Sequence, residues 1–269
     1  MLPELGTALG NRLGRTSWPV RAVQPAYAAW LRVAYGRRGL PWHFNGEPIK
    51  IDPDVRHLVP QEAERPLFEY LRAHIRPGDV VLDIGAFVGV YAIMEARWVG
   101  EQGRVIAFEP SPESFATLQR HLGMNGPAAR RVDARCLAIG ARSEQRGLRM
   151  FDREPYRNMI APHADASVLV GVAALDDMWQ TLDRPPTWIR MDVQGLEFDV
   201  LRGARDLLRE RRGRLTIVAE MHPHHWPSYG IEPGEARERL AELGLHARSV
   251  VPGDDPFGYD AHALLEPLN

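Results

Sequence analysis

The sequence predicts an α/β fold: a doubly wound, mostly parallel sheet that follows an N-terminal extension. Two observations predict it. Apolar runs alternate with helical patterns from about residue 62 onward, and a glycine-rich turn follows the first apolar run. Strands are expected at about 79–83, 104–109, 132–138, 186–192 and 214–220. Helices are expected at about 67–75, 89–99, 112–124 and 196–210. Ligands of such sheets bind at the carboxyl ends of the strands.

The first strand ends in a glycine-rich turn. Asp83 closes its apolar run, and Gly85, Ala86 and Gly89 follow before the next helical pattern. Glycines let the backbone approach a ligand that a Cβ atom would exclude. The second strand ends in Glu109, and an acidic side chain there is the usual partner of ribose hydroxyls. Together these features predict a ligand that carries a ribose; the plainer interpretation is an ordinary turn and a surface glutamate.

The remaining elements have their own start and stop signals. Ser111 and Pro112 supply an N-cap and a first-turn proline for the helix expected at 112–124. After a helix at about 233–243, two short strands are expected at about 246–251 and 261–265. A turn rich in proline, glycine and aspartate joins them.

Residues 1–60 are predicted to form an extension, and residues 61–269 the main domain. Helical patches from Leu2 to Gly36 are expected to break at Pro19 and Pro25. Asn45-Gly46 predicts a hairpin turn, and Pro48 restricts the second strand to an edge. The extension is rich in aromatic residues, so it packs over the main domain or serves as a lid or subunit contact.

Composition narrows the class of protein. The 269 residues are 45% hydrophobic and 25% charged, which is ordinary for a globular protein. The net charge of −2 supplies no global basic field, so neither nucleic acid nor an anionic membrane is an expected partner. The single cysteine excludes an internal disulfide framework. Arginines interrupt the N-terminus and no apolar run is long enough to span a membrane, so a cytoplasmic location is expected.

The acid at the head of the glycine motif favours a cationic ligand. The spacing Asp83-x-Gly85-x-x-x-Gly89 differs from the Gly-x-Gly-x-x-Gly pattern of dinucleotide sites. A carboxylate at this strand tip suits an ammonium or sulfonium group better than a pyrophosphate. S-adenosylmethionine carries both cationic groups and lacks phosphates, so the electrostatics favour a methyl donor.

The chain resembles the FkbM family of S-adenosylmethionine-dependent O-methyltransferases. The resemblance spans about residues 64–224. It rests on four blocks: Pro77–Ala86 with Gly89; Phe108-Glu109-Pro110; Leu175-Asp176-Asp177; and Ile189–Glu197 with Val200–Ala204 and Val218–Pro223. Phe87 stands where the family commonly has asparagine, and Gln194 where it commonly has glutamate. The resemblance implies the Rossmann-like class I methyltransferase fold.

The resemblance also implies roles for individual residues. Asp83, Gly85 and Gly89, with Ala86 in the same turn, would hold the methionine part of the donor, and Glu109 would bind its ribose. Leu137 would flank the adenine. Glu64 would lie over the cofactor, or it is an ordinary solvated charge at the start of a helix.

Three residues at the tips of later strands are candidates for catalysis. Methyl transfer to an alcohol requires aligned reactants and a group that accepts the proton. His222 is the expected base because its ordinary pKa lies near neutrality, with Asp192 and Glu220 beside it. His222 is alternatively a structural histidine, and Asp192 alternatively orients it or holds the donor ammonium.

A divalent metal is possible but not favoured. Asp192, Glu220 and His222, in a segment that continues with His224 and His225, have side chains that bind such ions. Pro223 and Pro227 predict an irregular loop there instead. Arg153, Arg157 and Asn158 lie in a polar loop and are candidates for contacts with a hydroxylated acceptor.

The expected function is therefore transfer of a methyl group from S-adenosylmethionine to a hydroxyl of a sugar, glycoconjugate or secondary metabolite. The alternatives are a nucleotide-dependent oxidoreductase and a catalytically inactive module that binds S-adenosylmethionine. The oxidoreductase would need the dinucleotide glycine spacing and a second nucleotide-binding half, and neither is visible in the sequence. Phe87 and Gln194 are the only support for an inactive module.

Overall fold

The computed structural model describes residues 18–151, 154–161 and 166–268. The chain divides into two compact units, Met1–Gln61 and Glu62–Asn269. Each unit is described by itself below. Within the described ranges, no helix is both long and apolar enough to cross a membrane.

One long helix opens the described part of the first unit. Helix α2 (Trp18–Tyr35) continues through Pro25, so the predicted break at this residue is wrong. Proline has a helical φ of its own and removes only one backbone donor, which a helix of this length tolerates when other contacts hold it. Arg32 supplies one such contact by pairing with Asp54 at 2.7 Å. The helical patches predicted before Trp18 lie outside the described residues.

A hairpin completes the first unit, as predicted. Strands β1 (Leu40–Phe44) and β2 (Glu47–Ile51) pair antiparallel around Asn45 and Gly46. These two residues have φ values of 49° and 88°, the left-handed pair that a type I′ turn requires. Two short 3₁₀ helices, η1 (Gly36–Arg38) and η2 (Pro53–Leu58), flank the hairpin.

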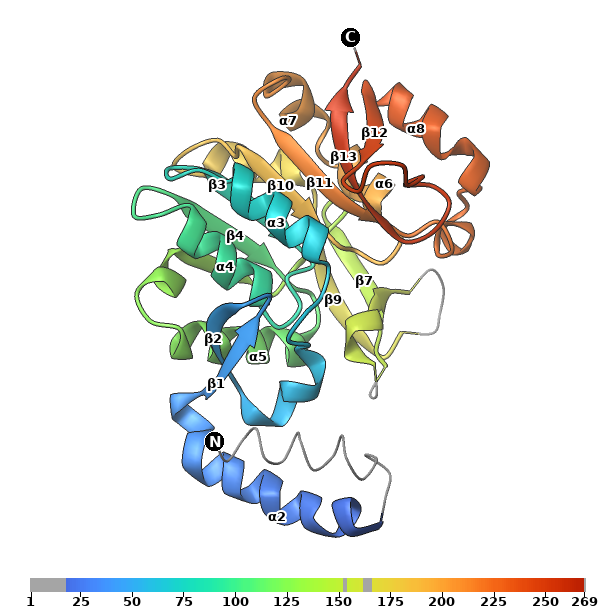
Figure 1. The fold of residues 1–269 in the computed structure, drawn as a ribbon. Helices are drawn as coiled ribbons and strands as arrows, with labels where there is room; N and C mark the ends of the chain where they lie inside the picture. Colours follow the sequence, from blue (N-terminus) through green and yellow to red (C-terminus); the bar gives the residue numbers. More distant parts are fainter. Residues whose placement is uncertain (1–17, 152–153, 162–165, 269) are drawn as a thin grey trace. The chain divides into compact units, whose positions relative to one another are not determined.

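A seven-stranded sheet forms the core of the second unit, counted over the described residues, in the order β12-β13-β11-β10-β3-β4-β5 (Figure 1). The five strands from β11 to β5 are parallel, whereas β13 and β12 run antiparallel to their neighbours. The strands are β3 (Val80–Ile84), β4 (Arg104–Phe108), β5 (Val132–Arg135), β10 (Trp188–Met191), β11 (Thr216–Met221), β12 (Leu245–Ser249) and β13 (Ala261–Pro267). The doubly wound, mostly parallel sheet of the prediction is confirmed.

Helices cover both faces of this sheet. Figure 1 shows α3 and α4 on the near face. Alternate strand residues such as Leu82, Ile189 and Ile217 pack instead with apolar side chains of α6, α7 and α8. The helices are α3 (Arg65–His74), α4 (Val90–Trp98), α5 (Pro112–Met124), α6 (Glu197–Arg202), α7 (Arg205–Glu210) and α8 (Ala236–Glu242).

The helix predicted at 196–210 is two helices, because Gly203 interrupts it. A Cβ atom at Gly203 would lie 2.0 Å from the carbonyl oxygen of Gly140. The helical path ends here, because Gly203 (ψ 3°) and Ala204 (φ −120°) depart from helical backbone angles. Asp176 then caps α7, because its carboxylate accepts hydrogen bonds from the backbone of Asp206 and Leu207 at 2.9 and 3.0 Å.

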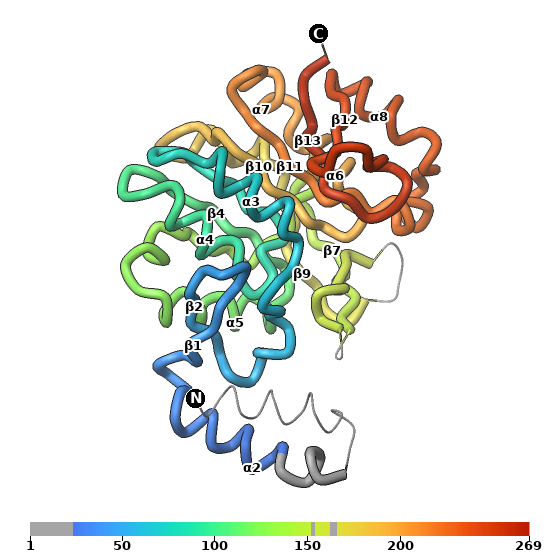
Figure 2. Tube along the Cα trace, viewed as in Figure 1, coloured from blue at the N-terminus to red at the C-terminus, as the bar shows by residue number. Residues whose placement is uncertain are grey.

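The strand predicted at 132–138 also ends early. Strand β5 stops at Arg135, and the chain enters a separate four-stranded sheet of order β6-β9-β7-β8. Its strands are β6 (Ala138–Ile139), β7 (Glu144–Arg149), β8 (Met159–Ile160) and β9 (Val168–Ala173). Figure 2 labels β7 and β9 of this sheet, in yellow-green to yellow. Two of these strands have only two residues, which gives too short a pattern to predict from sequence.

Candidate active site

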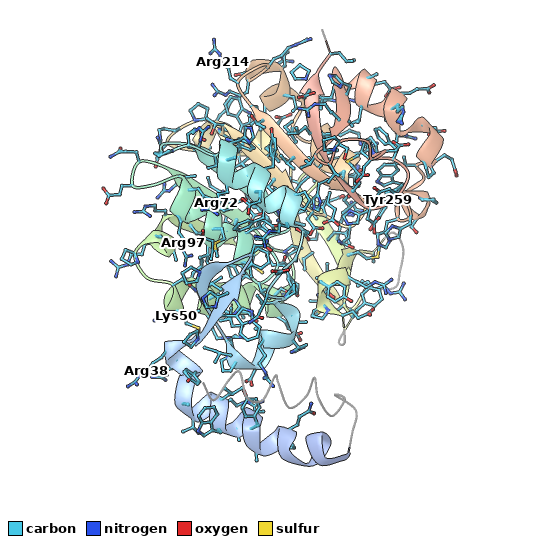
Figure 3. All side chains as sticks on the ribbon, in the orientation of Figure 1. Arg38, Lys50, Arg72, Arg97, Arg214 and Tyr259 are labelled. Atoms are coloured by element: carbon cyan, nitrogen blue, oxygen red, sulfur yellow. The ribbon has the colours of Figure 1, made fainter. Side chains whose placement is uncertain are left out.

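The site lies at the carboxyl ends of β3, β4, β10 and β11. Because these strands are parallel, the residues that follow them meet at one edge of the sheet: Gly85, Glu109, Asp192 and His222. By contrast, Arg214 and Tyr259, labelled in Figure 3, project from the surface of the second unit. Three residues near this edge adopt left-handed backbone without being glycine: Glu64, Phe87 and Gln194. Such strained conformations are typical of functional sites.

Gly85 fixes the glycine turn against the neighbouring strand. Its φ is 83°, and a Cβ atom added there would lie 1.9 Å from the backbone oxygen of Asp192. The backbone nitrogens of Gly85 and Ala86 both donate to the oxygen of Phe108 at 2.9 Å. The turn is thus hydrogen-bonded to the end of β4 on one side and packs closely against Asp192, the residue after β10, on the other. This packing alone requires a glycine at position 85.

Glu109 is held at the tip of β4 by two backbone donors. Phe87 N–H donates to Oε2 at 2.9 Å and Ser111 N–H donates to Oε1 at 2.8 Å. Burial raises the pKa of Glu109 to about 7, although these two donors act in the opposite direction. Phe87 binds Glu109 through its backbone N–H, and this hydrogen bond can form whether residue 87 is asparagine or phenylalanine.

A hollow of about 670 Å³, including its open mouth, adjoins this carboxylate. Gly85, Glu109, Leu137 and Asp192, four of the residues with a predicted cofactor or catalytic role, all line it. Five other lining residues had no site role predicted from the sequence: Pro110, Tyr156, Met159, Val193 and Leu196. Asp83, Ala86, Gly89, Glu64, Glu220 and His222 are not among the lining residues. A donor in this hollow would meet an apolar wall and two carboxylates.

Asp83 faces a buried arginine. Arg190 donates to Asp83 Oδ1 at 2.9 Å, and the two side chains are 7% and 0% exposed. The guanidinium also lies 3.7 Å from Asp192 Oδ2. Burial disfavours the charged guanidinium, but Asp83 and Asp192 outweigh it and raise the pKa of Arg190 well above its usual range. Asp83 is thus committed to Arg190, and only Asp192 of the pair reaches the hollow.

His222 belongs to a buried chain of polar groups. Its Nδ1 lies 2.7 Å from Glu197 Oε1, and the other oxygen of Glu197 accepts from Trp226 Nε1 at 2.7 Å. Its Nε2 lies 3.0 Å from the amide nitrogen of Gln194, which also donates to Asp192 Oδ1 at 2.9 Å. Asp192 and His222 are therefore joined through Gln194, at a position where the family commonly has glutamate.

The electrostatics of His222 differ from those of a free imidazole. Burial alone would lower its pKa, but the hydrogen bond with Glu197 and the charges of Glu197, Asp192 and Glu220 raise it to about 10. The contact from Gln194 acts in the other direction, since an amide donor at Nε2 requires the neutral ring. A pKa of about 10 corresponds to an imidazolium at neutral pH, and in that form Nε2 carries a proton and does not accept from the Gln194 amide. The sequence suggested a neutral His222 that could accept a proton, whereas the neighbouring carboxylates favour its protonated form.

Glu220 and its neighbours complete the acidic edge. Burial and the charge of Asp192 raise the pKa of Glu220 to about 8, although His222 lowers it. Glu64 Oε2 and Glu220 Oε2 each lie 3.7 Å from His262 Nε2. Burial lowers the pKa of His262. His262 was not a candidate from the sequence, because only the β11–β13 pairing brings it to Glu220.

The other candidates lie apart from this group. His224 pairs with Asp260 at 2.6 Å and is 53% exposed. Arg157 pairs with Glu154 at 2.8 Å, in its own loop, and does not line the hollow. Asn158 does line the hollow, where its side chain accepts from Phe151 N–H at 2.8 Å. Arg153 lies outside the described residues.

Fold and family match together define the class of protein. A glycine turn after β3 and an acid at the tip of β4, in a Rossmann-like sheet, are features of the class I methyltransferase fold. Residues 83–246, more than half of the chain, match the Methyltransferase FkbM domain. The chain belongs to the FkbM methyltransferase family. No curated protein matches the sequence.

Three solved structures are similar at low identity. Methyltransferase FkbM from Methylobacillus flagellatus KT is 20% identical over 70% of this chain and 43% of that chain, with a TM-score of 0.46. This chain thus spans less than half of that protein. Cofactor-bound Rv0187 from MTB is 20% identical over 99% and 98% of the two chains, with a TM-score of 0.47. The O-methyltransferase TomG from Streptomyces achromogenes, in complex with SAM, is 18% identical over 80% and 86%, with a TM-score of 0.45.

Proposed function

We propose that this chain transfers a methyl group from S-adenosylmethionine to a hydroxyl of a sugar, glycoconjugate or secondary metabolite. The observation that carries the donor assignment is Glu109, whose carboxylate is fixed by two backbone donors beside the hollow. Each fixed oxygen keeps a lone pair for a ribose hydroxyl. Leu137, Pro110 and Met159 supply an apolar wall for an adenine. The carboxylate of Asp192 favours the sulfonium and ammonium groups.

The transfer is an in-line displacement. A lone pair of the acceptor oxygen forms the new bond to the methyl carbon, the carbon–sulfur bond breaks, and its electron pair stays on sulfur. The acceptor hydroxyl loses its proton to a base. The chain must align the two partners and place that base.

Asp192 is the base that the geometry favours. It lines the hollow and is 24% exposed, whereas His222 is 2% exposed and does not line it. In this proposal the imidazolium of His222 acts on Asp192 through its charge, since its Nε2 lies 3.7 Å from Asp192 Oδ1. Glu220 Oε1 lies 3.8 Å from His222 Nε2, so the charge of Glu220 also acts on the imidazolium.

A metal at Asp192, Glu220 and His222 fits the donor set poorly. These side chains offer one ligand atom each within 4.8 Å of one another. Both ring nitrogens of His222 are already engaged, by Glu197 and Gln194. A divalent ion here would polarise the acceptor hydroxyl, but it would have to displace the Gln194 contact and the imidazolium proton.

Calorimetry with S-adenosylmethionine, its demethylated product and NAD tests the donor assignment. We expect both sulfur compounds to bind and NAD not to bind. Transfer of a labelled methyl group is then measured over a panel of sugars, glycoconjugates and hydroxylated metabolites, with RNA as the contrasting acceptor. NAD binding would favour an oxidoreductase instead, and donor binding without transfer to any acceptor would favour an inactive module.

A further inference from the structure

A second cluster of potential metal ligands lies next to the candidate base. We name Glu64, Glu220 and His262 the outer cluster; one ligand atom from each lies within 4.8 Å of the others. Glu64 immediately precedes α3, Glu220 is on β11, and His262 is on β13. The antiparallel register pairs Glu220 directly with His262, so their side chains lie on the same face of the sheet. Three separate elements thus converge on one point.

Two atoms of the outer cluster lack a hydrogen-bond partner. Glu64 Oε2 and His262 Nε2 are both shut off from solvent, and the described residues give neither atom a hydrogen bond, although the Glu64 carboxylate lies close enough to the Tyr91 hydroxyl that burial and this carboxylate together raise the pKa of Tyr91. Unsatisfied buried acceptors are costly, and native structures contain few of them. His262 Nε2 lies 3.7 Å from both Glu64 Oε2 and Glu220 Oε2, too far for a hydrogen bond. Ligands at about 2.1 Å from one ion are themselves about 3.0–3.6 Å apart, so a small contraction would close the cluster on a cation.

The inner cluster, made of Asp192, Glu220 and His222, differs in the state of its histidine. Both ring nitrogens of His222 already have partners at 2.7 and 3.0 Å. By contrast, His262 Nε2 is buried, has no hydrogen-bond partner among the described residues, and lies 3.7 Å from a carboxylate oxygen of both Glu64 and Glu220. Because the clusters share Glu220, one ion can occupy the outer cluster and leave the Gln194–His222 contact intact.

We propose that Glu64, Glu220 and His262 bind one divalent transition-metal ion, with Mn²⁺ or Zn²⁺ as the representative ions. A mixed set of imidazole and carboxylate ligands suits these ions, whereas Mg²⁺ prefers oxygen alone. The site stands on the cluster geometry and does not depend on the acceptor or on the proposed methyl transfer. Through Glu220 it lies beside His222, which is 3.8 Å from the shared carboxylate.

Binding of the ion alone tests the proposal. Mn²⁺ is titrated into the full chain, stripped with a chelator, and free Mn²⁺ is followed by electron paramagnetic resonance. We expect one bound ion per chain. Glu64→Gln and His262→Asn should each weaken binding roughly 10–100-fold. The absorption spectrum of bound Co²⁺ should lose its imidazole-dependent bands only in His262→Asn.

Matched variants locate the ion. His246 lies 3.9 Å from Glu266 on the same two-stranded edge and is 48% exposed, so His246→Asn should leave Mn²⁺ affinity unchanged. His222→Asn distinguishes the two clusters. Unchanged Mn²⁺ affinity in this variant supports the outer cluster. Loss of Mn²⁺ affinity in His222→Asn, together with normal Mn²⁺ binding in His262→Asn, would overturn the proposal. Absence of Mn²⁺ and Zn²⁺ binding also overturns it. So does a Glu64→Gln variant that loses only S-adenosylmethionine affinity, because the donor ammonium would then be the cation.

Discussion

Glu197 Oε1 and His222 Nδ1 lie 2.7 Å apart, in side chains that are 0% and 2% exposed. This pair sets the charge of the imidazole. Burial alone would lower the pKa of His222, but the hydrogen bond and the negative charge of Glu197 outweigh burial and, with Asp192 and Glu220, raise it to about 10. Glu197 opens α6 and His222 follows β11, so the pair also ties a helix to the catalytic edge of the sheet.

Replacing Glu197 with glutamine should lower the pKa of His222 toward its ordinary value of about 6.5. The folded pKa exceeds the unfolded one, so the imidazolium stabilises the fold fully below about pH 6.5 and loses this contribution as pH rises through about 10. The unfolding free energy of the parent protein should therefore fall more steeply from pH 6 to 9 than that of Glu197→Gln. ¹⁵N-histidine spectra and denaturant unfolding measure the two effects; equal slopes would contradict the assignment.

Glu109→Ala should weaken S-adenosylmethionine binding by about 1.5–3 kcal/mol, the value of a charge-assisted hydrogen-bond site. Because the pKa of Glu109 is raised to about 7, its stronger accepting form increases above that pH. Donor affinity should then rise between pH 6 and 8 in the parent protein, with a smaller rise in Glu109→Gln. Calorimetry with S-adenosylmethionine across this pH range measures both effects. A folded Glu109→Ala variant with unchanged donor affinity would contradict the assignment of Glu109 to the ribose.

Asp192→Asn should lower the turnover number by about 10²–10⁴, the usual contribution of positioned proton transfer. It should also weaken donor binding, because the lost carboxylate faces the cationic groups of the donor in the proposed complex. His222→Asn should also lower the turnover number, but by a smaller factor, because in the proposed mechanism this residue acts on Asp192 only through its charge. Turnover and donor affinity are measured on the same preparations. The reverse order of the two effects would return the role of base to His222.

Gly85→Ala should destabilise the fold by about 2–4 kcal/mol, since the new methyl group would meet a backbone oxygen at 1.9 Å from a left-handed residue. The matched control is Gly123→Ala in α5, where nothing lies within 4 Å of the new Cβ. That change should be neutral or stabilising, as expected for alanine inside a helix. Thermal unfolding of both variants tests the difference; a tolerated Gly85→Ala would show that this turn is free to move.

Removing residues 1–61 tests the predicted roles of the extension. Acceptor pockets in such folds are built from extensions and loops, so we expect a larger loss of acceptor turnover than of donor affinity. Calorimetry and turnover measurements separate the two. Normal kinetics in the truncated chain would leave packing as its only role.

The sequence predicted the strand tips of the site because each tip is a local pattern. Asp83, Glu109 and Asp192 each end an apolar run. Because the strands β3, β4 and β10 are parallel, these ends lie at the same edge of the sheet. The sequence did not predict Arg190 as the partner of Asp83, because the two lie 107 residues apart and meet only through the pairing of β3 with β10. His262 was missed for the same reason. The charge of His222 was also missed, since it depends on a buried carboxylate on another element.

The close approach of Gly85 to Asp192 couples two parts of the protein that an engineer would prefer to vary separately. Gly85 shapes the turn expected to hold the donor, and the oxygen that its absent Cβ would strike belongs to the proposed base. A change that adds bulk to this turn therefore presses on the backbone of the proposed base. Redesign of donor specificity in this scaffold will come with a cost in turnover, unless the segment after β10 is redesigned together with the turn.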